Sequence, residues 1–144
     1  MLKQFLVGGG FSMANIALHA LVMTLVVRVA QIAGDKRRSS HSLLLIAVMI
    51  PTVSVLMTTH AIEVVVWSWA YSVVSAAPAG TNLVYFAFVN YTTLGYGDVV
   101  PVPEWQLLGP MTAMNGVLLF GWSTAVIFEA LRRAMGRPGI STGE

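Results

Sequence analysis

Long apolar stretches without formal charge divide the chain into candidate membrane helices. About 20 helical residues cross the roughly 30 Å hydrocarbon core of a bilayer. Three runs of 24 residues contain no Asp, Glu, Lys or Arg: Gln4–Val27, Ser39–Ile62 and Trp105–Phe128. We therefore expect three membrane-spanning helices, at about 5–33, 43–75 and 106–134.

The second of these helices is longer than a simple span requires. Its 33 residues would extend about 50 Å at about 1.5 Å per residue. Pro51 removes a backbone donor and crowds the preceding turn, so a kink or a restart is expected there. Alternatively, the first turns lie at the membrane surface or the whole helix is strongly tilted. The pattern leaves these alternatives open.

A fourth uncharged run, Val64–Gly97, extends for 34 residues but is interrupted at Pro78 and Gly80. Beyond this break, residues 81–91 are apolar and aromatic, with Thr81 or Asn82 available as a helix N-cap. A helix over about 81–92 would reach roughly 18 Å, little more than half of the hydrocarbon core. We expect a re-entrant helix that enters the membrane without crossing it.

The segment after this helix fits neither a helix nor a strand pattern. Residues 92–98 read Thr-Thr-Leu-Gly-Tyr-Gly-Asp, and Gly95 and Gly97 allow backbone angles that other residues resist. Irregular backbone at membrane depth is tolerated only where it is buried in protein or lines a water-filled path. In symmetric copies its carbonyls can replace the hydration shell of a cation, and the Thr93 hydroxyl can add a further oxygen.

Residues 92–98 resemble the selectivity filter of the potassium channel superfamily, whose usual form is Thr-Val-Gly-Tyr-Gly-Asp. The order of helix, short helix, filter and helix resembles the pore domain of that family over roughly residues 55–135. The resemblance implies a homotetramer that conducts K⁺ passively and needs no organic cofactor. It places the ion-coordinating backbone at five residues: Thr93, Leu94, Gly95, Tyr96 and Gly97. Leu94 stands where valine is usual.

Five residues are expected to support the filter: Thr92, Asp98, Tyr85, Phe86 and Val89. Tyr85 and Phe86 are expected to pack around the Tyr96 ring as an aromatic cuff. Val89 stands where some members of the family carry a glutamate that pairs with the aspartate after the filter. Asp98 lacks that partner here, so its support must differ.

Four residues of the last helix are candidates for gating or for the cavity. Gly116 is interpreted equally well as a hinge or as a site of close helix packing, whereas packing is favoured for Gly121. Asn115 either faces the cavity or, as we favour, bonds to the re-entrant helix. Glu129 either forms an acidic ring at the pore mouth or pairs with Arg132 and the next arginine.

His60 and Glu63 form a candidate polar pair inside the second helix, because positions i and i+3 share a face. Ionisable groups within a span are functional candidates and usually face protein or water. The pair is either a proton sensor or, as we favour, a clamp between helices, with His19 as a partner on the first helix. Intramembrane catalysis by the pair is a remote alternative, and we expect no enzyme activity.

The composition narrows the class of protein. Hydrophobic residues make up 56% of the 144 residues and charged residues 10%, and the mean hydropathy is +0.75. This excludes a water-soluble monomer and a disordered chain. The net charge of +2 offers no broad basic surface for nucleic acid, and there is no cysteine. No small-molecule substrate is indicated, so the expected partners are membrane lipid and copies of the chain.

The positions of the basic residues predict the orientation. Seven of the eight lie near or after the end of the first or the third helix, and residues 76–105 contain none. The positive-inside rule therefore places the N-terminus outside and the C-terminus in the cytoplasm of a multi-pass protein of the inner cell membrane. Four aromatic residues are expected to form an outer aromatic belt: Trp67, Trp69, Tyr71 and Trp105.

The expected protein is all-α, with an additional helix and cytoplasmic loop over 1–38 and a pore domain over 39–144. Its expected function is that of a potassium-selective channel. A weakly selective cation channel and a non-conducting accessory protein that retains the pore fold are the alternatives.

Overall fold

A computed structural model describes residues 1–35 and 41–135, and this part of the chain is all-α. The predicted cytoplasmic loop around 36–38 and the tail from 136 to 144 lie outside the described residues. A short 3₁₀ turn, Pro103–Trp105, precedes the last helix. The four helices are α1 (Leu2–Asp35), α2 (His41–Val73), α3 (Leu83–Tyr91) and α4 (Leu108–Met135).

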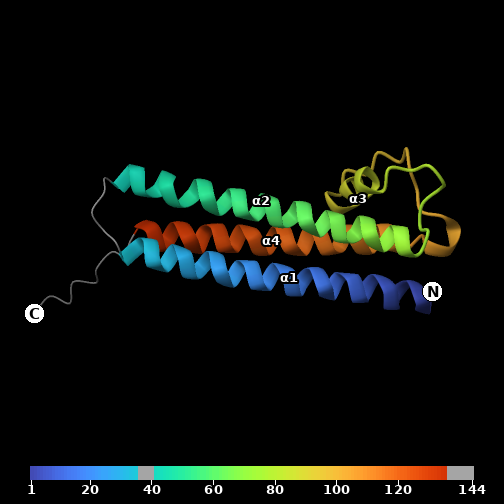
Figure 1. Cartoon of the computed structure of the whole chain (residues 1–144), viewed down its shortest axis with the longest axis horizontal. Coiled ribbons are helices and arrows are strands. Elements are labelled where there is room, and N and C mark those ends of the chain that lie inside the picture. Colours follow the sequence, from blue (N-terminus) through green and yellow to red (C-terminus); the bar gives the residue numbers. More distant parts are fainter. Residues whose placement is uncertain (36–40, 136–144) are drawn as a thin grey trace, which may run out of the picture.

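The three long helices run side by side, and the short α3 lies at one end of them (Figure 1). The N-terminus lies at the same end as α3, whereas α1 ends and α2 begins at the opposite end. The segments Leu2–Val29, Ile46–Val73 and Pro103–Arg132 are long and apolar enough to cross a membrane. The prediction of three spanning helices and one shorter helix is confirmed.

Helix α2 continues without interruption through Pro51. The expectation of a restart at this residue is therefore wrong, because the turns on both sides keep their helical hydrogen bonds while one donor is missing. Helix α1 packs against both α4 and α2. The additional helix is thus part of the packed bundle.

The larger core lies at the α3 end, where α2, α3 and α4 meet. Trp67, Tyr71 and Phe86 are completely or almost completely buried there, and the rings of Tyr71 and Phe86 lie 4.9 Å apart between centroids. The expectation that Trp67 and Tyr71 belong to a lipid-facing belt is wrong, because both anchor α2 to its neighbours. Trp69 is 63% exposed, as a belt residue would be.

Polar contacts fix the starts of α3 and α4. The side chain of Asn82 accepts a hydrogen bond from the Tyr85 amide at 3.1 Å and caps α3. The Leu107 amide, at the start of α4, donates to the side-chain oxygen of Gln4 on α1 at 2.8 Å. The first contact fixes where α3 begins, and the second joins the start of α4 to α1.

Candidate functional site: the segment after α3 and the polar groups behind it

The backbone of residues 93–97 alternates in handedness. Thr93, Gly95 and Gly97 have φ angles of 60°, 59° and 77°, while the two residues between them do not have positive φ. Positive φ in the β-branched Thr93 is a strained conformation that must be held by its surroundings. Alternating handedness turns successive peptide groups in the same sense. The carbonyls of this segment can therefore lie on one side of it.

The beginning of this segment is tied to the end of α3 by backbone hydrogen bonds. The Leu94 and Gly95 amides both donate to the Val89 carbonyl, at 3.0 and 3.4 Å. The Thr92 hydroxyl donates to the Phe88 carbonyl at 2.7 Å. Val89 thus supports the segment through its backbone oxygen, a role that its apolar side chain could not have indicated.

The far end of the segment is held by a side chain of α3. The Tyr85 hydroxyl donates to the Asp98 carboxylate at 2.7 Å. Because position 89 is a valine, the sequence did not show which group supports Asp98. The Tyr85 hydroxyl is that group. Because the hydroxyl donates to the Asp98 carboxylate, the pKa of Tyr85 is raised above its ordinary value.

The expected aromatic cuff around Tyr96 is not formed within one chain. Phe86 packs against Tyr71 in the core, and among the described residues no ring contact joins Tyr96 to Tyr85 or Phe86. Tyr96 is instead 68% exposed and Leu94 54% exposed. A single chain leaves all of residues 92–98 exposed.

The comparison with known families decides the identity. A family model described as an ion channel matches residues 59–133, which is just over half of the chain. The chain belongs to this ion channel family. The predicted resemblance to a potassium channel pore domain is confirmed for these residues, which include α3 and the segment after it, whereas α1 lies outside the match. No curated protein and no solved structure matches the channel.

Asn115 of the channel has partners that neither interpretation of the sequence named. Its side-chain oxygen accepts from Trp67 Nε1 at 3.0 Å and from the Asn15 amide at 3.2 Å, and its amide nitrogen lies 3.5 Å from the Ser12 carbonyl. Asn115 is almost fully buried. Both interpretations of Asn115, that it faces the cavity and that it bonds to the re-entrant helix, are therefore wrong. The reason is that α1 supplies polar groups in the middle of the bundle.

The two mid-helix glycines of α4 differ in their surroundings. A Cβ at Gly116 would collide with the backbone carbonyl of Tyr91, so this glycine lets α4 approach the end of α3 closely. A Cβ at Gly121 would meet nothing within 4 Å. The expectation that Gly121 serves packing is therefore wrong within one chain, since its surface faces outward. A hinge at Gly116 stays a prediction.

Glu129 pairs with an arginine of its own helix. Its carboxylate accepts from Arg132 Nε at 2.9 Å and lies 2.7 Å from the terminal nitrogen of the same side chain. The structure thus brings together the i, i+3 pair that was the alternative to an acidic ring. Arg132 is mostly exposed, and such pairs contribute little to stability.

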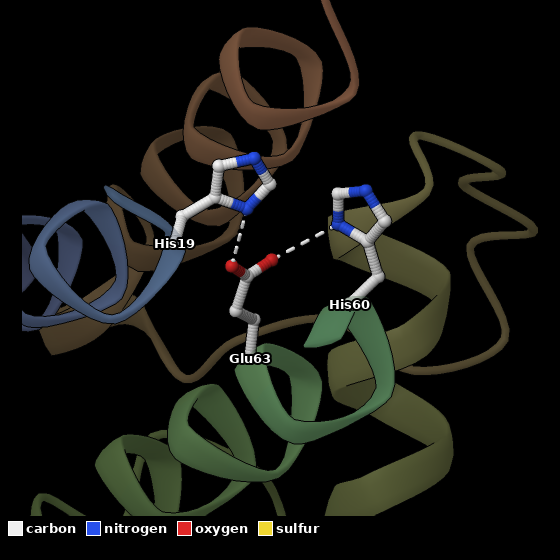
Figure 2. Close-up of side chains that lie close together, drawn as sticks. All are labelled: His19, His60 and Glu63. Carbon is white, nitrogen blue, oxygen red and sulfur yellow. Dashed lines mark hydrogen bonds and ion pairs between the residues drawn. The ribbon is translucent and has the colours of Figure 1, made fainter. Parts of the chain in front are cut away.

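Five polar side chains meet inside the bundle next to the end of α3, and we call them the polar cluster: His19, His60, Glu63, Tyr91 and Ser123. Glu63 is completely buried, and its two oxygens lie 2.8 Å from His19 Nδ1 and 3.0 Å from His60 Nδ1 (Figure 2). The Tyr91 hydroxyl donates to Glu63 and lies 2.9 Å from His60 Nδ1. The Ser123 hydroxyl lies 2.9 Å from His60 Nε2 and 3.4 Å from His19 Nε2. The cluster joins all four helices.

The sequence indicated three members of the polar cluster and missed two. His60, Glu63 and His19 stood out as ionisable groups in apolar helices, and the expected contact of His19 with this pair is present. Tyr91 was interpreted only as part of an apolar re-entrant helix, and Ser123 was not singled out. Single hydroxyls are common in membrane helices, so the sequence contained no signal that would select these two.

Proposed function

We propose that the channel conducts K⁺ selectively and passively as a homotetramer, through rings of backbone carbonyls from residues 93–97. The observation that carries this proposal is the alternating handedness at Thr93, Gly95 and Gly97, in a non-helical segment held at the end of a half-length helix. K⁺ is the permeant ligand and no organic cofactor is required. The Thr93 hydroxyl would add oxygens at the inner end.

Carbonyl oxygens of such a segment can take the place of the water around a dehydrated cation. One chain supplies oxygens from one side only, so several chains must surround a common axis. The exposure of Leu94 and Tyr96 supports this step, because large apolar side chains next to irregular backbone need protein around them at membrane depth. Neighbouring chains would complete the aromatic cuff that one chain lacks.

Helix α3 would favour a cation electrostatically. The carboxyl end of a helix has a partial negative charge, and the carboxyl end of α3 leads directly into residue 92. Four such ends arranged around one axis would concentrate cations at the inner end of the filter. The seven basic residues at or after the ends of α1 and α4 support a cytoplasmic location for the opposite end of the bundle.

The test is cation flux into liposomes that contain the purified channel, with the number of chains per assembly measured on the same sample. We expect tetramers that carry K⁺ and a reversal potential that follows K⁺ in mixed K⁺ and Na⁺. A reversal potential that follows both ions equally would contradict selectivity and would favour a weakly selective cation channel. Tetramers without flux above empty vesicles would contradict conduction and would favour an accessory protein.

A further inference from the structure

The polar cluster contains a set of groups that suits a transition-metal ion. The ligand atoms of His19, His60 and Glu63 lie within 4.8 Å of one another. Two imidazoles and a carboxylate form a ligand set that Zn²⁺ uses in proteins. Imidazole nitrogens also favour first-row transition metals over K⁺, Mg²⁺ or Ca²⁺.

The two histidines are oriented in the same way. Each ring directs Nδ1 towards an oxygen of Glu63, as Figure 2 shows, and each ring has Nε2 near Ser123. A histidine that binds a metal through one nitrogen usually donates from the other nitrogen to a fixed acceptor. A serine oxygen has two lone pairs and can accept from both Nε2–H groups. Ser123 is therefore placed to orient both rings.

Counting hydrogens distinguishes three states of the cluster. If one ring has both hydrogens, both Nδ1–H groups donate to Glu63, one Nε2–H donates to Ser123 and the Ser123 hydroxyl donates to the other Nε2, so every group is satisfied without a metal ion. The other two states have neutral rings. If both neutral rings have their hydrogen on Nδ1, both Nε2 atoms are acceptors, and the single hydrogen of Ser123 can satisfy only one of them. If both have their hydrogen on Nε2, Ser123 satisfies both, but two Nδ1 lone pairs then face the Glu63 carboxylate. A cation between His19, His60 and Glu63 makes the arrangement with a hydrogen on each Nε2 favourable.

We propose that the channel binds one Zn²⁺ or similar transition-metal ion per chain through His19 Nδ1, His60 Nδ1 and the Glu63 carboxylate, with Ser123 orienting both histidines. The Tyr91 hydroxyl, 2.9 Å from His60 Nδ1, lies beside the fourth position. Ligands of a tetrahedral zinc ion are about 3.3 Å apart. The two histidine–glutamate separations of 2.8 and 3.0 Å would have to increase by about half an ångström. The two histidine nitrogens, which lie within 4.8 Å of each other, would have to adjust to the same ion as well.

The surroundings of the site favour tight binding and couple it to the pore domain. The ring of Phe120 lies 4.5 Å from that of His60, and the ring of Trp122 lies 5.3 Å from that of His19, measured between centroids. These rings limit the access of water, which strengthens charge interactions at the site. A bound ion would join α1 to α2 directly beside the end of α3. The extra helix would then be linked through metal to the base of the filter.

The test uses the full channel in detergent, purified without a histidine tag, stripped with chelator and titrated with Zn²⁺ or Co²⁺. We expect one ion per chain and, for Co²⁺, the visible absorption of a tetrahedral site with nitrogen and oxygen ligands. His19→Gln and His60→Gln should each abolish this binding. His41→Gln is the matched control, because His41 begins α2 about 28 Å along the helix axis from His60 and should leave binding unchanged.

Ser123→Ala separates a metal site from a hydrogen-bonded clamp, because it removes no ligand. Loss of an orienting partner typically weakens metal binding about 10- to 100-fold, and we expect a loss in this range. Absence of stoichiometric binding by the unmodified channel would overturn the proposal, as would unchanged affinity in His19→Gln or in Ser123→Ala. Binding is measured without ion flux, so the outcome does not depend on whether the channel conducts K⁺.

Discussion

Two regions of the channel, only a few residues apart at the end of α3, are built on opposite principles. The segment of residues 93–97, which is the proposed filter, offers backbone oxygens, is strained at Thr93 and is exposed in a single chain. The polar cluster offers side chains, is buried and is completed by the four helices of one chain. Tyr91, the last residue of α3, belongs to the polar cluster and lies two positions before Thr93.

The difference indicates where each region is assembled. In the proposed tetramer, neighbouring chains would cover the segment that one chain leaves exposed, and the geometry of this segment depends on backbone angles that few residues adopt. A buried charged group must instead find its partners within the chain, because an unpaired charge in a membrane is costly. Substitutions should therefore affect conduction at the first region and stability at the second.

The largest expected effect concerns conduction. Gly95→Ala places a side chain on a backbone with φ of 59°, a conformation that disfavours every residue except glycine. The segment should rearrange, and we expect K⁺ flux to fall to the level of empty vesicles while tetramers persist. Liposome flux and assembly size, measured on the same preparation, check this expectation.

The matched control for Gly95→Ala is Gly80→Ala. Gly80 has φ of 82° and open space around its Cβ position, but it lies in the loop before α3. The backbone strain is of the same kind, whereas the proposed ion path is not changed. Equal loss of flux in both variants would contradict the assignment of residues 93–97 to the ion path.

The next expected effect concerns stability. Glu63→Gln removes the charge on which His19, His60 and Tyr91 converge, and breaking a buried charged group typically costs about 3 to 5 kcal/mol. Glu129→Gln is the control, since a partly exposed pair with Arg132 is worth less than about 1 kcal/mol. Denaturant unfolding in detergent measures both. Equal destabilisation would show that the polar cluster does not hold the bundle together.

A smaller effect is expected from the glycines of α4. The Cβ of Gly116→Ala would collide with the Tyr91 carbonyl, and overpacking of this kind typically costs about 1 to 3 kcal/mol. Gly121→Ala meets open space and should stabilise the helix by up to about 1 kcal/mol. Unfolding of the two variants under identical conditions makes the comparison. Gly116→Ala as stable as the unmodified channel would contradict the close approach of α4 to α3.

Most of the fold could be predicted from the sequence because a membrane restricts the choice of structure. Uninterrupted apolar runs of spanning length must be helices, and the observed α2 (His41–Val73) and α4 (Leu108–Met135) begin and end within two residues of the expected positions. The short helix α3 was predicted from the short apolar run between Gly80 and the later glycines, and from the N-cap at its start. The path of α2 through Pro51 could not be predicted, since a helix can tolerate a proline when neighbouring helices support it.

Contacts between helices could not be predicted in the same way. Asn115 was consistent with two environments, whereas Trp67 and Tyr91 were each assigned a single environment that did not include their polar partners. These partners depend on how the helices pack against one another. Every apolar helix in lipid has a similar composition on all sides, so the pattern does not show which face meets which neighbour. Only the ionisable residues were informative, because the cost of leaving them unpaired limits where they can lie.

The smallest expected effect concerns the contact that supports the proposed filter. Tyr85→Phe removes the hydroxyl that donates to Asp98, an exposed contact, and we expect K⁺ flux to change by less than about tenfold. The raised pKa of Tyr85 sets the pH dependence: the protonated hydroxyl is favoured in the folded channel, so its contribution is complete below the ordinary tyrosine pKa and is lost as pH rises through the raised value. Flux of the unmodified channel should therefore approach that of Tyr85→Phe at high pH. Tyr71→Phe, whose hydroxyl contacts Thr112 in the core, should lower stability without this convergence, and convergence in both variants would contradict a specific role for the Tyr85–Asp98 contact.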